Sequence, residues 1–255
     1  MPALFIGHGS PMNAVEDNGF TRAWAAMAEE LPRPEVVLAI SAHWYGPGIA
    51  VTAMATPRTI YDFGGFPPEL YEVAYPAPGS PALAARVADL LAPEPVGLDD
   101  RWGLDHGVWS VLRRLFPAAD VPVVQLSLAA QQPPANHYRL AQQLAPLRDE
   151  GVLVIGSGNV VHNLHAYLWG PRCATPLDWA ARFETKVRDR LRARDHAALV
   201  DYPSLGEEAA LAVPTPEHYL PLLYVIALQR PGEQVTFPVE GFDGGAISML
   251  AVRIG

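Results

Sequence analysis

Short apolar runs alternate with longer amphipathic segments along most of this chain. The apolar runs predict β-strands at 3–6, 36–41, 49–53, 121–126, 152–155, 234–237 and 247–252. The longer segments predict helices at 19–31, 81–91, 108–116, 135–147, 177–194 and 219–229. In the fifth helix an apolar side chain recurs every four residues and marks one buried face, at Trp179, Phe183, Val187 and Leu191. This alternation is typical of βαβ architecture, so the sequence predicts an α/β fold whose central sheet, largely parallel or mixed, is flanked by helices.

Composition narrows the domain organisation and the classes of partner. The chain has 255 residues, of which 50% are hydrophobic and 18% are charged, so it can bury a sizeable core. Open α/β sheets of about 250 residues often form one unit, and we therefore expect a single domain over 1–255. The formal net charge of −9 disfavours a nucleic-acid partner, because such a surface repels a phosphate backbone.

Membrane and secretion signals are not visible in the sequence. No apolar run approaches the roughly 20 residues that a membrane-spanning helix needs, so we expect no membrane partner. The N-terminal residues lack the basic region and cleavage site of a secretory signal, which predicts a cytoplasmic protein. The single cysteine, Cys173, has no second cysteine for a disulfide or a zinc knuckle and is interpreted as a bystander thiol.

Three histidines follow predicted strands. His8 comes after the strand at 3–6, His43 after the strand at 36–41, and His162 after the strand at 152–155. In open α/β sheets the ligand crevice lies outside the carboxyl ends of the strands, so these side chains should converge on one edge. A lone histidine is more often structural, but three at strand ends favour a site.

Two further histidines have distinctive neighbours. Thr215 is a plausible helix N-cap with Pro216 at the first helical position, which places His218 in the first turn. The positive end of the helix dipole there keeps the imidazole neutral and able to bind a metal. His106 lies between two tryptophans just before a helix, which suits a role in proton transfer rather than metal binding. The remaining histidines are interpreted as surface or capping residues: His137, His165 and His196.

The segment 55–79 has no periodicity and is rich in aromatic residues, glycine and proline. Long irregular segments in compact domains are often functional, although this one could equally be a surface excursion that packs its own aromatic side chains. Flat walls for an aromatic ligand could come from here or from the tryptophan-containing motifs, with these candidates: Trp44, Tyr45, Phe63, Phe66 and Trp102.

Neutral imidazoles suit zinc, iron, copper and nickel, so the histidines alone do not fix the metal. The sequence has no helical His-Glu-x-x-His pair, which argues against the common metalloprotease arrangement. The Gly-x-Gly turns at 7–9 and 156–158 lack the third glycine of a dinucleotide-binding loop.

Five linked motifs resemble one known family: Gly-His-Gly-Ser-Pro from Gly7, Ser-Ala-His-Trp from Ser41, Leu-Asp-His-Gly from Leu104, Gly-Ser-Gly-Asn from Gly156 with His162-Asn163 behind it, and Pro-Thr-Pro-Glu-His-Tyr from Pro214. In this order they resemble the LigB-type (class III) extradiol ring-cleavage dioxygenases, and within them the 4,5-DOPA dioxygenase-like branch. The resemblance spans nearly the whole chain.

The resemblance implies one non-haem Fe(II), with Zn(II) also found in such sites, and a catechol that is cleaved with O2 to a semialdehyde. By motif, His8, His43 and His218 carry over as metal ligands. His162 carries over as a fourth ligand or as the catalytic acid/base, and His106 as a catalytic hydrogen-bonding group near substrate and oxygen. The wider superfamily uses two histidines and a carboxylate. If that pattern held here, Glu217 would replace His218.

Two other functions are compatible with the same residues. Three histidines with an open coordination position could activate water in a zinc hydrolase. A fold of this type could also serve as a non-catalytic metal-binding scaffold. The bond that is cleaved, the identity of the catechol and the oligomeric state stay open, and three arginines could each bind a substrate carboxylate: Arg58, Arg101 and Arg172.

Overall fold

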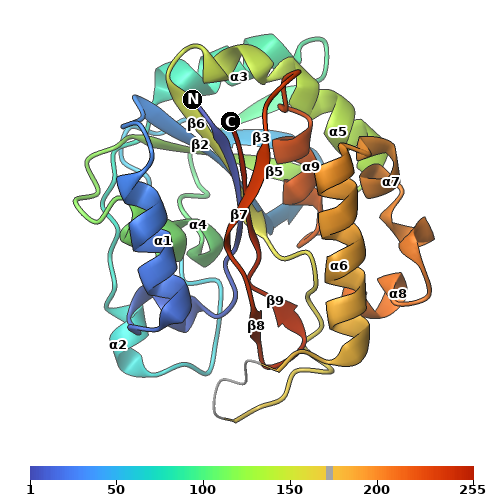
Figure 1. Cartoon of the computed structure of the whole chain (residues 1–255). Helices are drawn as coiled ribbons and strands as arrows, with labels where there is room; N and C mark the ends of the chain where they lie inside the picture. Colours follow the sequence, from blue (N-terminus) through green and yellow to red (C-terminus); the bar gives the residue numbers. More distant parts are fainter. Residues whose placement is uncertain (171–174) are drawn as a thin grey trace.

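The computed structural model describes residues 1–170 and 175–255. Within these residues one eight-stranded sheet has the order β4-β3-β5-β2-β6-β1-β10-β7, and two short strands form a separate hairpin (Figure 1). The strands of the large sheet are β1 Ala3–Gly7, β2 Val36–Gly46, β3 Ile49–Thr52, β4 Val96–Asp99, β5 Val123–Ala129, β6 Val152–Gly158, β7 Val235–Val239 and β10 Ala251–Ile254; the hairpin pairs β8 Phe242–Asp243 with β9 Ile247–Ser248.

The centre of the sheet is parallel and both its margins contain antiparallel pairs. Strands β5, β2, β6 and β1 run parallel to one another, whereas at one margin β10 is antiparallel to β1 and β7 is antiparallel to β10. At the other margin β3 is antiparallel to β5 and parallel to β4. The predicted α/β class with a mixed central sheet is therefore confirmed.

Helices cover both faces of the sheet, as Figure 1 shows with α1 and α4 on one side and α5, α6 and α9 on the other. In β1, Leu4 and Ile6 pack towards α1 and α4, while Ala3 and Phe5 pack towards α5, α6 and α9. The strand is therefore buried on both faces. The helices are α1 Gly19–Glu29, α2 Pro68–Tyr71, α3 Pro81–Leu91, α4 His106–Leu115, α5 Pro134–Gln143, α6 Asp178–Ala193, α7 His196–Val200, α8 Ala209–Ala212 and α9 Leu220–Ile226, with 3-10 turns at Pro11–Ala14, Ala145–Arg148 and Tyr202–Leu205.

Some predicted elements have different boundaries. The strand predicted at 36–41 continues to Gly46, with an irregularity in its pairing with β5 between Ile40 and Tyr45. The helix predicted at 135–147 ends at Gln143 and continues as a 3-10 turn, because Pro146 lacks the N–H that an α-helix needs there. The strand predicted at 247–252 is two strands, β9 and β10. Strand β4 was not predicted.

The apolar stripe predicted in α6 is buried as expected at Phe183, Val187 and Leu191, while Trp179 is only partly buried. Over the described residues, none of the helices combines the length and apolar character that crossing a membrane requires.

Candidate active site

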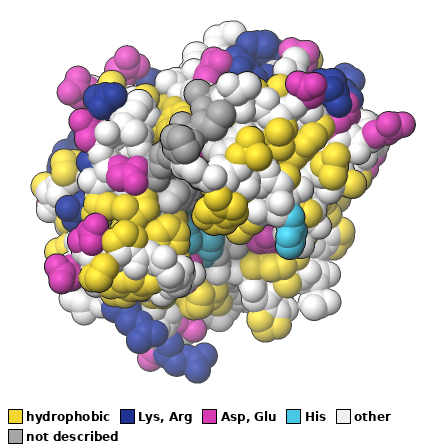
Figure 2. All heavy atoms as spheres, turned by 90° about the horizontal axis from the view of Figure 1, so that it is seen from below, with side chains coloured by type: hydrophobic (Ala, Val, Ile, Leu, Met, Phe, Trp, Pro, Cys, Tyr) yellow, Lys and Arg dark blue, Asp and Glu magenta, His cyan; other side chains and the backbone are white. Residues whose placement is uncertain are grey.

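Five histidines line one cavity at the carboxyl edge of the sheet. The cavity has a volume of about 310 Å³ and contains His8, His43, His106, His162 and His218. Figure 2 looks onto this edge of the molecule, where histidine atoms are visible in a hollow between apolar side chains. His8 follows β1, His43 lies in the irregular part of β2 and His162 follows β6. The structure thus brings together every histidine that the motifs singled out.

The side-chain proton of His8 is fixed by Ser157. The Ser157 hydroxyl donates to the carbonyl of Gly107, so at 3.0 Å from His8 Nδ1 it accepts the proton of that nitrogen. His8 therefore carries its proton on Nδ1 and presents the lone pair of Nε2 to the cavity.

Carboxylates fix His43 and His218 in the same tautomer as His8. His43 Nδ1 lies 3.2 Å from Asp62 Oδ2, and His218 Nδ1 lies 3.2 Å from Glu217 Oε1. An ionised carboxylate oxygen this close to a ring nitrogen attracts a proton on that nitrogen and repels its lone pair, so both Nδ1 atoms are protonated and both Nε2 atoms keep their lone pairs. Partners of this kind set the orientation of metal-binding histidines.

These three rings are arranged as a cation site. One nitrogen from each of His8, His43 and His218 lies within 4.8 Å of the others, and the Nε2 atoms of His8 and His43 are 3.0 Å apart. Two facing lone pairs repel unless a cation lies between them. His218 Nε2 is buried and has no hydrogen-bond partner among the described residues. The residues therefore fit a divalent metal with imidazole ligands.

Burial keeps the imidazoles neutral. It lowers the pKa of His8 and His43 well below 6.5, and the neighbouring imidazoles lower both further. The pKa of His218 is also lowered, mainly by burial, and that of His162 falls to about 2 for the same reason and through His218. Burial, rather than the helix dipole invoked from the sequence, keeps these rings ready to bind a metal.

The predicted local structure around His218 is wrong. The α-helix begins at Leu220, so His218 lies in the preceding turn, and the Thr215 hydroxyl donates to Glu217 instead of capping a helix. Pro221 sits in the first helical turn, where its missing N–H costs nothing. Because Glu217 accepts from both Thr215 and His218, its contacts orient the imidazole.

His162 also differs from expectation, because no helix begins there. Its backbone forms an antiparallel bridge with Ile247 and its N–H donates to the carbonyl of Ala212. The ring stacks on His218 with 3.5 Å between centroids and 5° between planes. The backbone of His162 is therefore held on both sides.

Asp62 is a site residue that the sequence reading missed. One of its carboxylate oxygens accepts from His106 Nδ1 at 2.9 Å and lies 3.2 Å from His43 Nδ1, and the other accepts from the backbone N–H of His106 at 2.9 Å. His106 is the first residue of α4, two residues earlier than predicted, since the Asp105 side chain caps this helix. The residues next to Asp62 carry no motif that predicts a site residue. The only signal was the long irregular, aromatic segment in which it lies.

The segment 55–79 contributes to the cavity and also packs its own aromatic side chains. Phe63 and Phe66 line the cavity, which makes the segment part of the site. Its aromatic rings also pack on one another, with Phe63 and Tyr71 centroids 5.2 Å apart. By contrast Trp44 and Trp102, expected as cavity walls, stack on each other with centroids 5.3 Å apart and do not line it.

Two of the three candidate arginines are not at this cavity. Arg58 and Arg101 line a separate surface hollow, and Arg172 lies outside the described residues. Tyr45, the remaining candidate wall, is also absent from the cavity lining.

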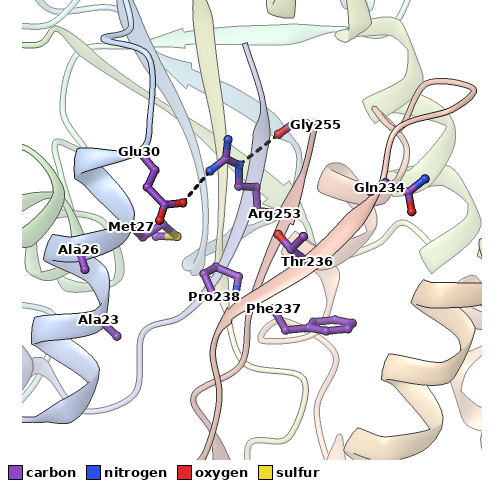
Figure 3. Close-up of a pocket in the computed structure, with 10 residues that line it drawn as sticks. All are labelled: Ala23, Ala26, Met27, Glu30, Gln234, Thr236, Phe237, Pro238, Arg253 and Gly255. Atoms are coloured by element: carbon purple, nitrogen blue, oxygen red, sulfur yellow. Dashed lines mark hydrogen bonds and ion pairs between the residues drawn. The ribbon is translucent and has the colours of Figure 1, made fainter.

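A larger cavity of about 730 Å³ lies between α1 and the strands β7 and β10 (Figure 3). Its charged groups are already paired, since Arg253 contacts Glu30 at 3.4 Å and the carbonyl of Gly255 at 3.1 Å. Histidine is not among its lining residues, so this cavity offers no counterpart to the histidine site.

Replacing Gly158 with alanine is expected to destabilise the fold and weaken metal binding. A Cβ atom at Gly158 would overlap the carbonyl oxygen of His218, and relief requires a shift of the turn that carries this imidazole. Overpacking of this kind costs about 1–3 kcal/mol. Urea unfolding and metal titration of Gly158→Ala measure both effects. Gly48→Ala, which has open space at its Cβ position, is the control, and equal behaviour of the two variants would contradict the expectation.

His137 is buried, contrary to the surface or capping role expected for it, and should make the protein acid-labile. Its Nδ1 lies 3.1 Å from the Tyr224 hydroxyl, and burial lowers its pKa to about 4. Below pH 6.5 His137 binds a proton in the unfolded chain but stays neutral in the folded chain. The free energy of unfolding therefore falls as the pH drops towards 4. We expect His137→Gln to lose about 2 kcal/mol less between pH 7 and 5 than the native chain, by urea unfolding. His165→Gln, at an exposed histidine, should show the same pH dependence of stability as the native chain. If His137→Gln also showed the native pH dependence, the role assigned to His137 would be refuted.

A mixed α/β sheet with a cluster of neutral imidazoles at its carboxyl edge defines a class of metal-dependent enzyme, and comparisons with known proteins place the chain within it. Residues 2–236 match the family model described as the catalytic LigB subunit of aromatic ring-opening dioxygenase. The chain belongs to the LigB family.

Individual relatives agree with this placement. The chain is 51% identical to the 4,5-DOPA dioxygenase extradiol of Escherichia coli K12, over 100% of this chain and 95% of that protein. It is 38% identical to the 4,5-DOPA dioxygenase extradiol of Beta vulgaris, over 96% and 93% of the two chains. The crystal structure of "uncharacterized protein JW3007" from Escherichia coli K12 superimposes with a TM-score of 0.87 at 47% identity, covering 100% of both chains. The family resemblance and the ring-cleaving dioxygenase activity read from the motifs are confirmed.

Proposed function

We propose that this chain is an extradiol dioxygenase that uses one non-haem Fe(II) to cleave a DOPA-like catechol with O2 to a semialdehyde. The observation that carries the proposal is the common tautomer of His8, His43 and His218, whose Nδ1 atoms each face an oxygen atom of the protein while their Nε2 lone pairs converge. Bound by these three residues, Fe(II) would supply the open coordination positions and the electron transfer between catechol and O2 that ring cleavage requires.

His162 is the proposed acid/base. Its neutral ring lines the cavity beside His218 and is in the form that accepts a proton from a catechol hydroxyl. An anionic catecholate close to the ring then favours the imidazolium, which can return the proton when the ring opens.

His106 is proposed to bind substrate or oxygen through Nε2. Because its Nδ1 proton is donated to Asp62, the Nε2 lone pair is available as an acceptor. The aromatic side chains of Phe63 and Phe66 would give the catechol ring a flat surface and exclude water from it.

Anaerobic loading of the protein with Fe(II), followed by L-DOPA and air, tests the proposal. We expect close to one divalent metal per chain, a visible spectrum that changes as the semialdehyde forms, and oxygen uptake that chelation abolishes and Fe(II) restores. Rescue by Zn(II) to the same level would contradict an iron dioxygenase and favour the zinc hydrolase. Full metal occupancy without oxygen uptake for any catechol would favour the non-catalytic scaffold. Cytoplasmic location and the lack of nucleic-acid and membrane partners stay predictions from the sequence.

A further inference from the structure

Among the described residues that line the active-site cavity, Asp243 alone carries a carboxylate. It is the last residue of β8 and is 1% exposed. Its Oδ1 accepts a hydrogen bond from the Tyr167 hydroxyl at 3.0 Å. Its Oδ2 is buried and has no hydrogen-bond partner among the described residues. A buried carboxyl oxygen without a donor is costly, so this atom is prepared for a donor that arrives with a ligand.

The position of Asp243 suits contact with a ring substituent of the catechol. Ile247 pairs with Asp243 in the β8–β9 hairpin and bridges to His162, so the three residues follow one another along a single wall. With about 5 Å between the Cα atoms of each antiparallel pair, the Cα atoms of Asp243 and His162 lie about 10 Å apart across the two pairings. A catechol held by its two ring oxygens at the histidines has its para substituent pointing away from them, which lets the substituent follow this wall.

The remaining walls of the cavity offer no competing charge. Apart from the histidines, they are mainly apolar or aromatic, and the described lining residues include neither lysine nor arginine. A substituent with a positive charge therefore meets an opposite charge in a weakly polar environment, whereas a carboxylate meets a like charge and no cation.

We propose that Asp243 selects catechols whose ring substituent ends in a primary ammonium group, which donates to Oδ2, and that a carboxylate on the substrate is not required. This inference rests on the proposed dioxygenase function. It makes Asp243 a specificity-determining residue of the same cavity and predicts that an amine without a carboxylate is accepted better than a carboxylate without an amine.

Four catechols with different substituents test the proposal by oxygen uptake: L-DOPA, dopamine, 3-(3,4-dihydroxyphenyl)propionate and 4-methylcatechol. For the Fe(II)-loaded native enzyme we expect the kcat/KM of dopamine to exceed that of 4-methylcatechol, with the propionate the poorest. In Asp243→Asn the kcat/KM of L-DOPA and dopamine should fall about 10- to 100-fold, mainly through KM, as expected for loss of a hydrogen bond to a charged group. The rate with 4-methylcatechol should stay within about 2-fold, as expected for a substituent that makes no polar contact with this residue.

Asp189→Asn is the matched control, because it removes the same charge from an exposed site on α6. A loss of kcat/KM that is equal for all four catechols would show that Asp243 is structural, and unchanged kinetics with dopamine would also overturn the proposal. A second measurement is independent of turnover: calorimetry gives the dissociation constants of dopamine and 4-methylcatechol for the Zn(II)-loaded protein. They separate the two hypotheses: without turnover of any catechol the dioxygenase proposal fails, while a loss of dopamine affinity confined to Asp243→Asn still supports ammonium recognition.

Discussion

Replacement of His43 with alanine is expected to remove metal and activity together. His43 lies in β2, in the middle of the sheet, and its ring is held by Asp62 with its Nε2 atom 3.0 Å from that of His8. A rigid strand cannot move another donor into the vacated position, so one of the three proposed ligands is lost outright. We expect metal content to fall from near one per chain to a small fraction, and oxygen uptake to fall at least about 10³-fold with it.

Metal content by mass spectrometry and oxygen uptake by electrode measure the two losses in the same preparation. His165→Ala is the matched control, because it removes an exposed histidine that does not line the cavity. A His43→Ala protein that keeps its full metal content would remove His43 from the proposed set of ligands.

Replacement of His162 with alanine should separate metal binding from catalysis. The ring lies against His218 rather than among the three converging nitrogens, so the variant should keep most of its Fe(II) and still bind catechol. Without the proposed proton-transfer group we expect turnover to slow about 10²- to 10⁴-fold. Iron content measured beside His43→Ala decides the assignment. Comparable metal loss in both variants would make His162 a full ligand, and the role of base would then pass to His106.

Hydrophobic patterning was sufficient to predict the fold class because the central strands are buried on both faces and read as continuous apolar runs. It failed where the backbone depends on tertiary contacts. Strand β4 has only four residues, none of them buried, and is held by pairing with β3. The turn before α9 is set by contacts of Glu217 with Thr215 and His218, which no local helix signal could reveal.

The histidines of the site could be found from sequence because strand ends converge on one edge. The carboxylates of the site, Asp62 and Asp243, could not be found in this way. Asp62 comes from an irregular segment whose path across the molecule has no periodic signal, and its role follows from contacts with His43 and His106, far away in the chain. Asp243 lies in a strand of two residues, too short to register as a pattern. The ring orientations, and therefore the tautomers, depend on these partners.

The double contact of Asp62 has a consequence for engineering the pocket by loop exchange. The segment 55–79 provides aromatic walls, which makes it an obvious part to transplant between relatives with different substrates. Its aspartate, however, contacts His43, one imidazole of the proposed cation site, and His106, the imidazole proposed to bind substrate or oxygen. A graft that shifts this carboxylate would disturb metal affinity and substrate preference at once, so a usable chimera must transfer the walls while leaving Asp62 and its backbone in register.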